Sequence, residues 1–521
     1  MIDLPVLETK APQKIDVLFI HPGSCHAVYQ DLGRDLSALE PPVLAALFAT
    51  YVRNKGLTTD IIDAPVHNIN AAQVADIVCQ HFQPVLVVVV VYGFQPSAST
   101  QTMTAAGEIC REIKNRKYAL KIMMTGTHPA ALPERTMLEE AIDFVSDREG
   151  PISIYQTARC LKDGLKDGIA AGIGKSVHSD ISESTDEYAS IPNLWYRKND
   201  EIHRAESTAL INDLDREMPI PAWDLLPMEK YRAHNWHCFE NISERQPYAS
   251  IYTSLGCPYK CAFCCINAPF GKPSYRMWSP ETIIKQIDVL VRQYGVKNIK
   301  IADEMFVLNR QHVLSLCDLL IERGYDLNIW AYARVDTVKD EYLDKLRKAG
   351  FRWLALGIES GSNHVRDGVE KGRFGIPEII NTVRKIQDAG INVIGNYIFG
   401  LPDDSDDTMK ETLALAQEAN CEFANFYSAM AYPGSKLYDV ALAKGLSLPD
   451  TWLAYSQHSY HCQPLPTAAL SAGQVLKFRD DAFMTYYTNP GYLEYVRKKF
   501  GIEVVQHIEQ MTKIQLERKI Y

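Results

Sequence analysis

Three cysteines stand close together near the middle of the sequence. Cys257, Cys261 and Cys264 lie in the segment Cys-Pro-Tyr-Lys-Cys-Ala-Phe-Cys, directly after Gly256. Thiolates are ligands of zinc and of iron–sulfur clusters, and a [4Fe-4S] cluster normally takes four of them. Three ligands leave one iron open to chelate the amino and carboxylate groups of a small molecule and to pass an electron to it. The spacing therefore predicts a three-cysteine [4Fe-4S] cluster.

A zinc site is the alternative use of these thiols. Such sites usually combine two pairs of closely spaced ligands, and the sequence offers no second pair. Cys265 follows Cys264 directly, so it is badly placed to bind the same cluster, and we interpret it as a packing residue. Cys317 stands among apolar residues and is interpreted as core.

A regular alternation of strand and helix patterns surrounds the cysteines. Strand patterns occupy residues 248–255, 298–303, 327–333, 353–358, 391–399 and 422–430. The helix after the first of them is marked by Ser279 as N-cap, Pro280 in its first turn and Gly295 at its end. These units predict an open or partial parallel (β/α)6 barrel over residues 248–445, with its chemistry on the loops that follow the strands.

Residues 15–155 alternate in the same way. Strand patterns occupy residues 14–20, 58–64, 84–94, 120–126 and 142–147. The apolar run Val85–Val91 is far shorter than the ~20 residues of a membrane helix and is typical of a buried parallel strand. We predict an α/β, Rossmann-like doubly wound domain whose ligands bind at the carboxyl ends of the strands.

The remaining segments have weaker patterns. Residues 156–247 predict an extended linker, with a mobile insertion over 164–188 that is rich in Gly, Ser and Asp. Residues 446–521 predict a small, mainly helical unit on the substrate side of the barrel. Trp452, Tyr455, His458 and Tyr460 are its candidate pocket residues, although core packing is the commoner role for such side chains.

Composition narrows the class of protein. The chain has 521 residues, 46% hydrophobic and 23% charged, as in a globular protein of about three units. Its net charge of −10 argues against a general nucleic-acid partner. The first residues lack the pattern of a signal peptide, and 12 cysteines without such a signal predict reduced thiols. We expect a cytoplasmic protein with no membrane span.

The cysteine segment in this setting resembles the radical S-adenosylmethionine (SAM) superfamily over residues 248–445. The resemblance implies a [4Fe-4S] cluster on Cys257, Cys261 and Cys264 that cleaves SAM to a 5′-deoxyadenosyl radical, with an electron donor such as flavodoxin or ferredoxin. It also implies SAM contacts in and after the strands, from Phe263, Asp303, Glu304, Arg334, Glu359, Ser360 and Asn396. Each has an ordinary alternative: Arg334 can pair with Asp336, and Glu359 can be a surface carboxylate.

A Rossmann-like domain ahead of this barrel resembles the cobalamin-dependent branch of the superfamily. The resemblance rests on the Pro41-Pro42 helix start and on the turns at residues 126–130 and 147–150. It implies cobalamin contacts from Ser97, Gly126, His128 and Glu149. Many cobalamin proteins carry Asp-x-His-x-x-Gly, whose histidine binds cobalt. The corresponding loop here, from His21 to Gln30 and including Cys25 and His26, reads differently, as it often does in this branch.

The two resemblances together imply cobalamin-dependent methylation of an unactivated carbon in a small-molecule or biosynthetic-intermediate substrate. A cobalamin-dependent cyclase, hydroxylase or rearrangement enzyme is the alternative, and a non-catalytic cofactor sensor or binding protein is the alternative from another class. A methylthiotransferase would add three N-terminal cluster cysteines and a basic RNA-binding domain. Cys79 and Cys110 lie within helical patterns and no basic C-terminal barrel is evident, which disfavours that interpretation.

Overall fold

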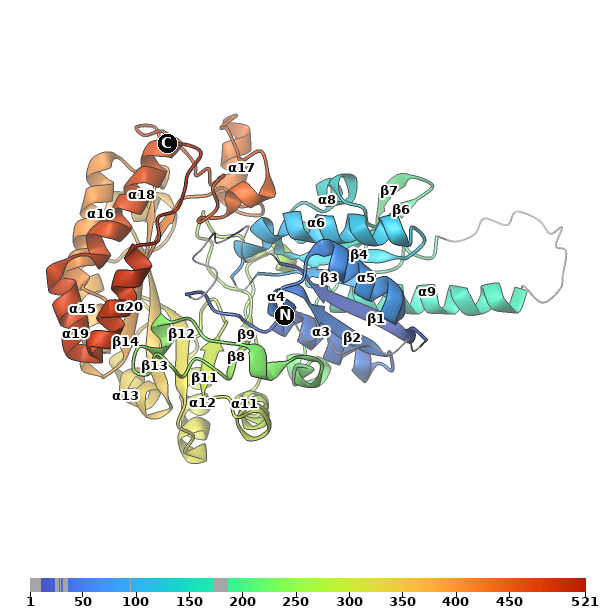
Figure 1. The fold of residues 1–521 in the computed structure, drawn as a ribbon, viewed down its shortest axis with the longest axis horizontal. Coiled ribbons are helices and arrows are strands. Elements are labelled where there is room, and N and C mark those ends of the chain that lie inside the picture. The colour runs from blue at the N-terminus through green and yellow to red at the C-terminus, as the bar shows by residue number, and fades with distance from the viewer. Residues whose placement is uncertain (1–10, 24–27, 29, 31–35, 94, 172–185) are drawn as a thin grey trace.

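A computed structural model of the chain describes residues 11–23, 28, 30, 36–93, 95–171 and 186–521, without the side chains of residues 165–171. Cys25, His26 and most of the predicted insertion lie outside the described residues. Figure 1 shows two α/β units side by side, with the C-terminal helices packed against the second. None of the described helices is long and apolar enough to cross a membrane.

The N-terminal sheet contains five parallel strands in the order β2-β1-β3-β4-β5, which confirms the predicted doubly wound class. Helices lie on both faces, so the strands are buried along most of their length. The strands are β1 (Gln13–His21), β2 (Thr59–Asp63), β3 (Phe82–Val91), β4 (Ile122–Gly126) and β5 (Phe144–Ser146). The helices are α3 (Val43–Asn54), α4 (Ala64–His67), α5 (Ala71–His81), α6 (Ala98–Arg116), α7 (Thr127–Ala131), α8 (Pro133–Glu139) and α9 (Pro151–Ala171).

Part of the predicted linker belongs to this domain instead. Helix α9 continues to Ala171, and β6 (Leu194–Lys198) and β7 (Glu201–Arg204) extend the sheet as antiparallel strands beyond β5. The two strands have only five and four residues and several polar side chains, so no alternating pattern stands out in the sequence. Their one local signal is the turn Asn199-Asp200, where both residues have positive φ (51° and 63°), as a tight hairpin turn requires.

The second unit is an open barrel of six parallel strands in sequence order, which confirms the prediction. The strands are β8 (Tyr248–Ile251), β11 (Asn298–Ile301), β12 (Asn328–Arg334), β13 (Phe351–Glu359), β14 (Asn392–Phe399) and β15 (Phe423–Ser428). A small hairpin, β9 (Ser254–Leu255) and β10 (Arg276–Met277), frames the cysteine segment. The helices are α11 (Pro280–Tyr294), α12 (Arg310–Arg323), α13 (Asp340–Lys348), α14 (Asn363–Gly368), α15 (Ile376–Asp388), α16 (Asp406–Ala419) and α17 (Lys436–Ala443).

Local sequence explains where the barrel helices begin and end. The Ser279 side chain accepts a hydrogen bond from Thr282 N at the start of α11, and Gly295 ends that helix in the left-handed conformation, as predicted. Between the domains the chain forms the short helix α10 (Leu214–Glu217) and three 3-10 helices, Trp223–Leu225, Met228–Lys230 and Trp236–Cys238.

The C-terminal unit is helical, as predicted, and many of its tyrosines serve packing. It comprises the 3-10 helix Trp452–Tyr455 and the helices α18 (Ala472–Tyr487), α19 (Pro490–Phe500) and α20 (Ile502–Thr512). The hydroxyls of Tyr486, Tyr487 and Tyr492 are buried and donate to backbone carbonyls at Cys421, Ala424 and Glu422. These bonds fix α18 and α19 to β15.

A buried ion pair joins the two domains. Glu40, just before α3, lies 3.2 Å from the ammonium of Lys300 on β11, and both side chains are only 4% exposed. The Glu40 carboxylate also accepts a hydrogen bond from Ser250 Oγ on β8 at 2.6 Å. The pair holds the edge of the N-terminal domain against the inner face of the barrel.

Replacing Glu40 should weaken this junction. Glu40→Gln keeps the side-chain shape but removes the negative charge beside buried Lys300, and breaking such a pair destabilises a protein by about 3–5 kcal/mol. We expect the urea unfolding transition, followed by near-UV circular dichroism, to move to lower urea concentration. Glu341→Gln is the control. It breaks the exposed pair with Arg310 and should change stability by less than about 1 kcal/mol. Equal transitions for the two variants would contradict the role of Glu40.

Candidate active site

The cysteine segment forms a tight loop beyond the first barrel strand. Gly256 precedes it with φ +87°, and a Cβ there would lie 2.5 Å from Ser274 O, so the turn requires glycine. Cys257 is buried, whereas Cys261 and Cys264 are half-buried, and none of the three forms a disulfide. Cys264 N donates to Cys261 O at 3.0 Å, which bends the chain so that the thiols follow one another around a turn.

Burial controls the protonation of these thiols. It raises the pKa of Cys257 to about 11 and that of Cys264 well above its usual value, and the charges of Cys261 and Glu304 raise both further. Arg334 Nη1 lies 3.8 Å from Cys261 Sγ and offers it a cationic donor. Because only thiolates bind iron, loading the loop with metal must release protons from Cys257 and Cys264.

The three thiols fit an iron–sulfur cluster better than a zinc ion. In the described part of the chain, no three His, Cys, Asp or Glu side chains are gathered closely enough to share one metal ion. A structural zinc site needs such convergence of four ligands. A cubane cluster does not, because each cysteine sulfur binds a different iron.

The two acidic residues after β11 differ in their surroundings. Asp303 is buried, and its carboxylate accepts hydrogen bonds from Thr253 N, Thr253 Oγ1 and Ser254 Oγ, each at 2.6 Å. Burial raises its pKa to about 6 in spite of these bonds. Asp303 thus orients the strand that leads into the cysteine loop. Glu304 is half-buried, and burial and the neighbouring Asp303 raise its pKa to about 7.

Charged residues of β12 and β13 converge beside Cys261. Arg334 pairs with Asp336 at 2.9 Å, which is the alternative considered for it, and its guanidinium also lies 3.9 Å from the centre of the Tyr259 ring in the cysteine loop. Lys371 Nζ donates to Glu359 Oε1 at 2.6 Å. A Cβ at Gly357 would lie 2.5 Å from Lys371 Nζ, so the buried pair needs a glycine at that position. Burial works to lower the pKa of Lys371, but the Glu359 and Cys261 charges outweigh it and raise that pKa.

The backbone at the end of β13 is strained. Glu359 has φ +67°, which is rare for a residue with a side chain, and the β13–β14 register shifts between Gly357 and Glu359. Such strain concentrates at binding sites, where a side chain must be aimed away from the regular sheet. It directs Glu359 towards Lys371 and the cysteine loop.

The other predicted SAM residues are spread over the same barrel end. Ser360 is fully buried, and its hydroxyl contacts Thr412 Oγ1 at 3.2 Å. Asn396 is half-buried, donates to Leu356 O at 3.1 Å and lines the cavity described next. Phe263 is half-buried, with Lys371 Nζ 5.9 Å from its ring centre. Contact of any of these residues with SAM remains a prediction.

A cavity of about 560 Å³ lies between the two domains. Its barrel wall comes from the inner faces of β11 to β15 and includes Lys300, Trp330, Tyr332, Ala355, Asn396 and Asn425. Its N-terminal wall comes from the carboxyl ends of β1 and β3 and the start of α6, and includes His21, Gly23, Gly93, Gln95, Gln101 and Thr102. The cavity therefore joins the ligand-binding edges of both sheets.

The four predicted cobalamin residues do not line this cavity. Glu149 binds Arg276 of β10 at 2.6 Å and so connects the domains. His128 is buried, lies 4.4 Å from the Trp452 ring, and has a pKa lowered to about 3 by burial and by Arg135. Gly126 has φ +152° and passes so close to Val91 that a Cβ would collide with it. Ser97 is the N-cap residue of α6, and its side chain makes no capping hydrogen bond. Cobalamin contact by these residues remains a prediction.

Other residues form the cavity wall that sequence reasoning missed. His21 Nδ1 lies 2.8 Å from Asp63 Oδ1, and Tyr231 donates to the same carboxylate at 2.7 Å. His21 ends β1, so its position after the first strand was the available signal. Arg479, on α18, had no sequence signal, because only the folded chain brings it to the cavity. Of the four tail candidates, His458 lines the cavity, whereas Tyr460 is exposed.

The N-terminal wall suits a large planar group that carries amide side chains, as the corrin ring does. Its small residues permit close approach, and its amide and hydroxyl groups offer hydrogen bonds to amides. The small residues are Gly23, Gly93 and Ala98. The amide and hydroxyl groups belong to Gln95, Gln101 and Thr102. The wall and the cysteine loop thus fit cobalamin and a [4Fe-4S] cluster.

Comparison with known proteins identifies a family for each of the two domains. A sequence model of the radical SAM superfamily matches residues 251–416, and one of the B12 binding domain matches residues 30–154. An uncharacterized methyltransferase of Pyrococcus horikoshii is 27% identical over 451 residues, 86% of this chain and 88% of the relative. An anaerobic magnesium-protoporphyrin IX monomethyl ester cyclase of Rubrivivax gelatinosus is 24% identical over 515 residues, 97% of this chain and 84% of the relative.

Solved structures share the fold. The radical SAM methyltransferase TsrM of Kitasatospora setae, with cobalamin and a [4Fe-4S] cluster bound, has a TM-score of 0.64 at 16% identity, over 92% of this chain and 90% of its own. The cobalamin-dependent radical SAM enzyme OxsB has a TM-score of 0.65 at 16% identity, over 96% of this chain and 72% of its own.

These matches confirm the resemblance drawn from the cysteine loop and the Rossmann-like domain. They imply a [4Fe-4S] cluster and SAM for the barrel and cobalamin for the N-terminal domain. The chain therefore contains a B12-binding domain over residues 30–154 and, after it, a radical SAM domain over residues 251–416.

Proposed function

We propose that the protein methylates an unactivated carbon of a small-molecule substrate, with SAM as methyl source and cobalamin as carrier. The observation that carries the proposal is the shared cavity. It is bounded on one side by the carboxyl ends of β1 and β3 in the N-terminal sheet and on the other by the inner face of the barrel. A substrate in this cavity would lie between the two domains that carry the cofactors.

The residues of the chain hold and orient these groups. Cys257, Cys261 and Cys264 hold the cluster, and the Arg334 guanidinium offsets charge at Cys261. Glu304, next to the loop, binds the amino group of SAM, with Glu359 held in place by Lys371. When bound, the cluster supplies an electron, SAM a carbon radical and a methyl group, and cobalamin a methyl carrier. The aromatic and apolar walls keep water away from the reacting atoms.

The cellular setting follows from the oxygen-sensitive chemistry. The cluster needs a low-potential electron, so we propose flavodoxin or ferredoxin as the donor and the reducing cytoplasm as the compartment. The net charge of −10 supports a small-molecule substrate rather than a nucleic acid.

A cobalamin-dependent cyclase is the second candidate. The relative from Rubrivivax gelatinosus supports it, since that cyclase aligns with 97% of this chain. A cyclase reaction needs the carbon radical but transfers no methyl group. The two candidates therefore differ in what becomes of the SAM methyl group.

Product analysis without substrate should separate the two candidates. We expect anaerobic, cluster- and hydroxocobalamin-loaded protein, given strong reductant and SAM labelled at its methyl group, to form both 5′-deoxyadenosine and S-adenosylhomocysteine. The label should be recovered with the corrin. Formation of 5′-deoxyadenosine alone, with no labelled corrin, would contradict the methyltransferase proposal and favour the cyclase. Failure to cleave SAM in either way would favour a non-catalytic binding protein.

The cysteine assignment predicts a contrast between adjacent thiols. Cys261→Ala removes a cluster ligand and should abolish most bound iron and sulfide, together with 5′-deoxyadenosine formation. Cys265→Ala removes a thiol that is only 2% exposed and that we place in packing, so iron, sulfide and SAM cleavage should be retained. Iron and sulfide analysis with chromatography of the nucleosides measures both. Loss of the cluster in Cys265→Ala alone would overturn the assignment.

The N-terminal cavity wall should be the cobalamin site. Gln101→Trp fills that wall from α6 and should lower the hydroxocobalamin content at least tenfold, because the corrin needs the space. Glu108→Trp places the same ring on the exposed face of the same helix and should leave corrin content unchanged. The absorption spectrum after gel filtration reports corrin, and iron analysis shows that the barrel remains loaded. Normal corrin in Gln101→Trp would place cobalamin elsewhere.

A further inference from the structure

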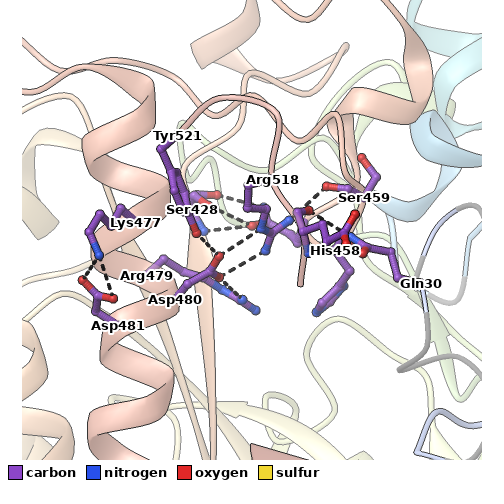
Figure 2. A network of polar contacts seen from close by, with 12 residues as sticks. Gln30, Ser428, His458, Ser459, Lys477, Arg479, Asp480, Asp481, Arg518 and Tyr521 are labelled. Carbon is purple, nitrogen blue, oxygen red and sulfur yellow. Dashed lines mark hydrogen bonds and ion pairs between the residues drawn. The ribbon is translucent and has the colours of Figure 1, made fainter. Parts of the chain in front are cut away.

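Two arginines and one aspartate form a buried network on the C-terminal side of the cavity (Figure 2). Asp480 accepts hydrogen bonds from Arg479 Nη1 at 2.6 Å and from Arg518 Nε at 2.9 Å. Arg518 Nη2 and the Tyr521 hydroxyl donate to the same carboxylate at 3.1 and 2.6 Å. The side chains of Arg479 and Arg518 are 8% and 1% exposed. The network is therefore rigid and largely removed from water.

Arg479 reaches the cavity with part of its guanidinium unused. Its Nε donates to Phe426 O on β15 at 2.7 Å, and its Nη1 donates to Asp480. Its Nη2 has no hydrogen-bond partner within the described part of the chain, although Arg479 is a wall residue of the cavity. A buried arginine keeps its charge, and an unused donor on it has a strong preference for an anionic oxygen.

The other charged side chains at this end of the cavity already have partners. Two guanidiniums face the single carboxylate of Asp480, whereas Asp481 pairs with Lys477 and Glu40 pairs with Lys300. Burial, and then the charges of Arg479 and Arg518, lower the pKa of His458 in the same wall to about 3. His458 is thus neutral at physiological pH, and among the side chains of this network two guanidiniums share one carboxylate.

The rest of the wall near Arg479 is apolar and aromatic. It includes Phe426, Tyr427, Phe483, Met484 and Met511, and it continues to Trp330 and Tyr332 across the barrel. Such a wall favours a ligand whose aromatic or aliphatic part lies next to its charged group. A molecule anchored at Arg479 would extend across the inner face of the barrel towards the ends of β1 and β3.

We propose that Arg479 anchors an anionic group of the substrate, a carboxylate or a phosphate attached to an apolar or aromatic body. Arg518 and Asp480 position the Arg479 side chain, and its Nη2 donates to the anion. This inference rests on the proposed function, because the bound molecule is the substrate that the cofactors modify. It adds the chemical class of the substrate and the group of the substrate that the protein binds.

A pair of probes with one aromatic skeleton tests the charge requirement. 1-Anilinonaphthalene-8-sulfonate is anionic, and N-phenyl-1-naphthylamine is its neutral counterpart. Binding of each is measured by anaerobic equilibrium dialysis with cluster- and hydroxocobalamin-loaded protein. We expect Arg479→Gln to weaken binding of the anion at least tenfold, because a charge-assisted hydrogen bond is lost, and to change binding of the neutral probe less than twofold. Arg479→Lys should recover part of the anion affinity.

Arg497→Gln is the matched control. Arg497 lies on α19 with a side chain 57% exposed, so the same change of charge and shape there should alter neither probe. Equal loss of both probes in Arg479→Gln, or no loss of the anion, would overturn the proposal. Loss of corrin from Arg479→Gln, with displacement of the anion by hydroxocobalamin, would overturn it too, because the anion would then be the phosphate of the cofactor.

The same samples keep this test separate from the proposed function. S-adenosylhomocysteine formation without substrate reports methyl transfer to cobalamin and does not require Arg479. Its presence without an effect on the anionic probe overturns only the substrate class. If Arg479→Gln weakens only the anionic probe and no S-adenosylhomocysteine forms, the anion site is supported. The proposal that is then contradicted is methyl transfer.

Discussion

The parallel direction of the strands determines where the loops that follow them lie in this molecule. The carboxyl ends of the strands lie along one edge of each sheet, so the loops after the strands gather there, whatever their sequences. The N-terminal domain presents the ends of β1 and β3 to the inner face of the barrel. The cysteine loop and the charged residues beside it owe their proximity to this constraint, and so do the two walls of the shared cavity.

Sequence patterns predicted the parts of the fold that depend on local regularity. The strands of both parallel sheets, the capped helix α11 and the three-cysteine loop each carry their signal in adjacent residues. The hairpin β6–β7 was missed because its strands have only five and four residues, too few for a pattern to stand out. The cavity could not be predicted, since it is made by residues as distant in sequence as His21 and Arg479.

Side-chain roles were harder to predict than positions. Asp303 stands at the expected strand end, but its carboxylate is occupied by Thr253 and Ser254. Glu149 stands in the expected turn, but it pairs with Arg276 of the other domain. A sequence shows that a carboxylate stands at a strand end. Its hydrogen-bond or ion-pair partner depends on which residue, distant in the sequence, the fold brings next to it. Buried charge must be compensated, and the folded chain supplies that compensation across domains.

The β6–β7 hairpin has a consequence for how the protein behaves at high concentration. An uncovered edge of a sheet invites strands from other molecules, and the apolar strand β3 is the type of segment that forms amyloid-like stacks. In this sheet β4, β5 and β6 separate β3 from the edge strand β7. That edge is only four residues long and carries Glu201 and Arg204, so it offers a poor template for aggregation.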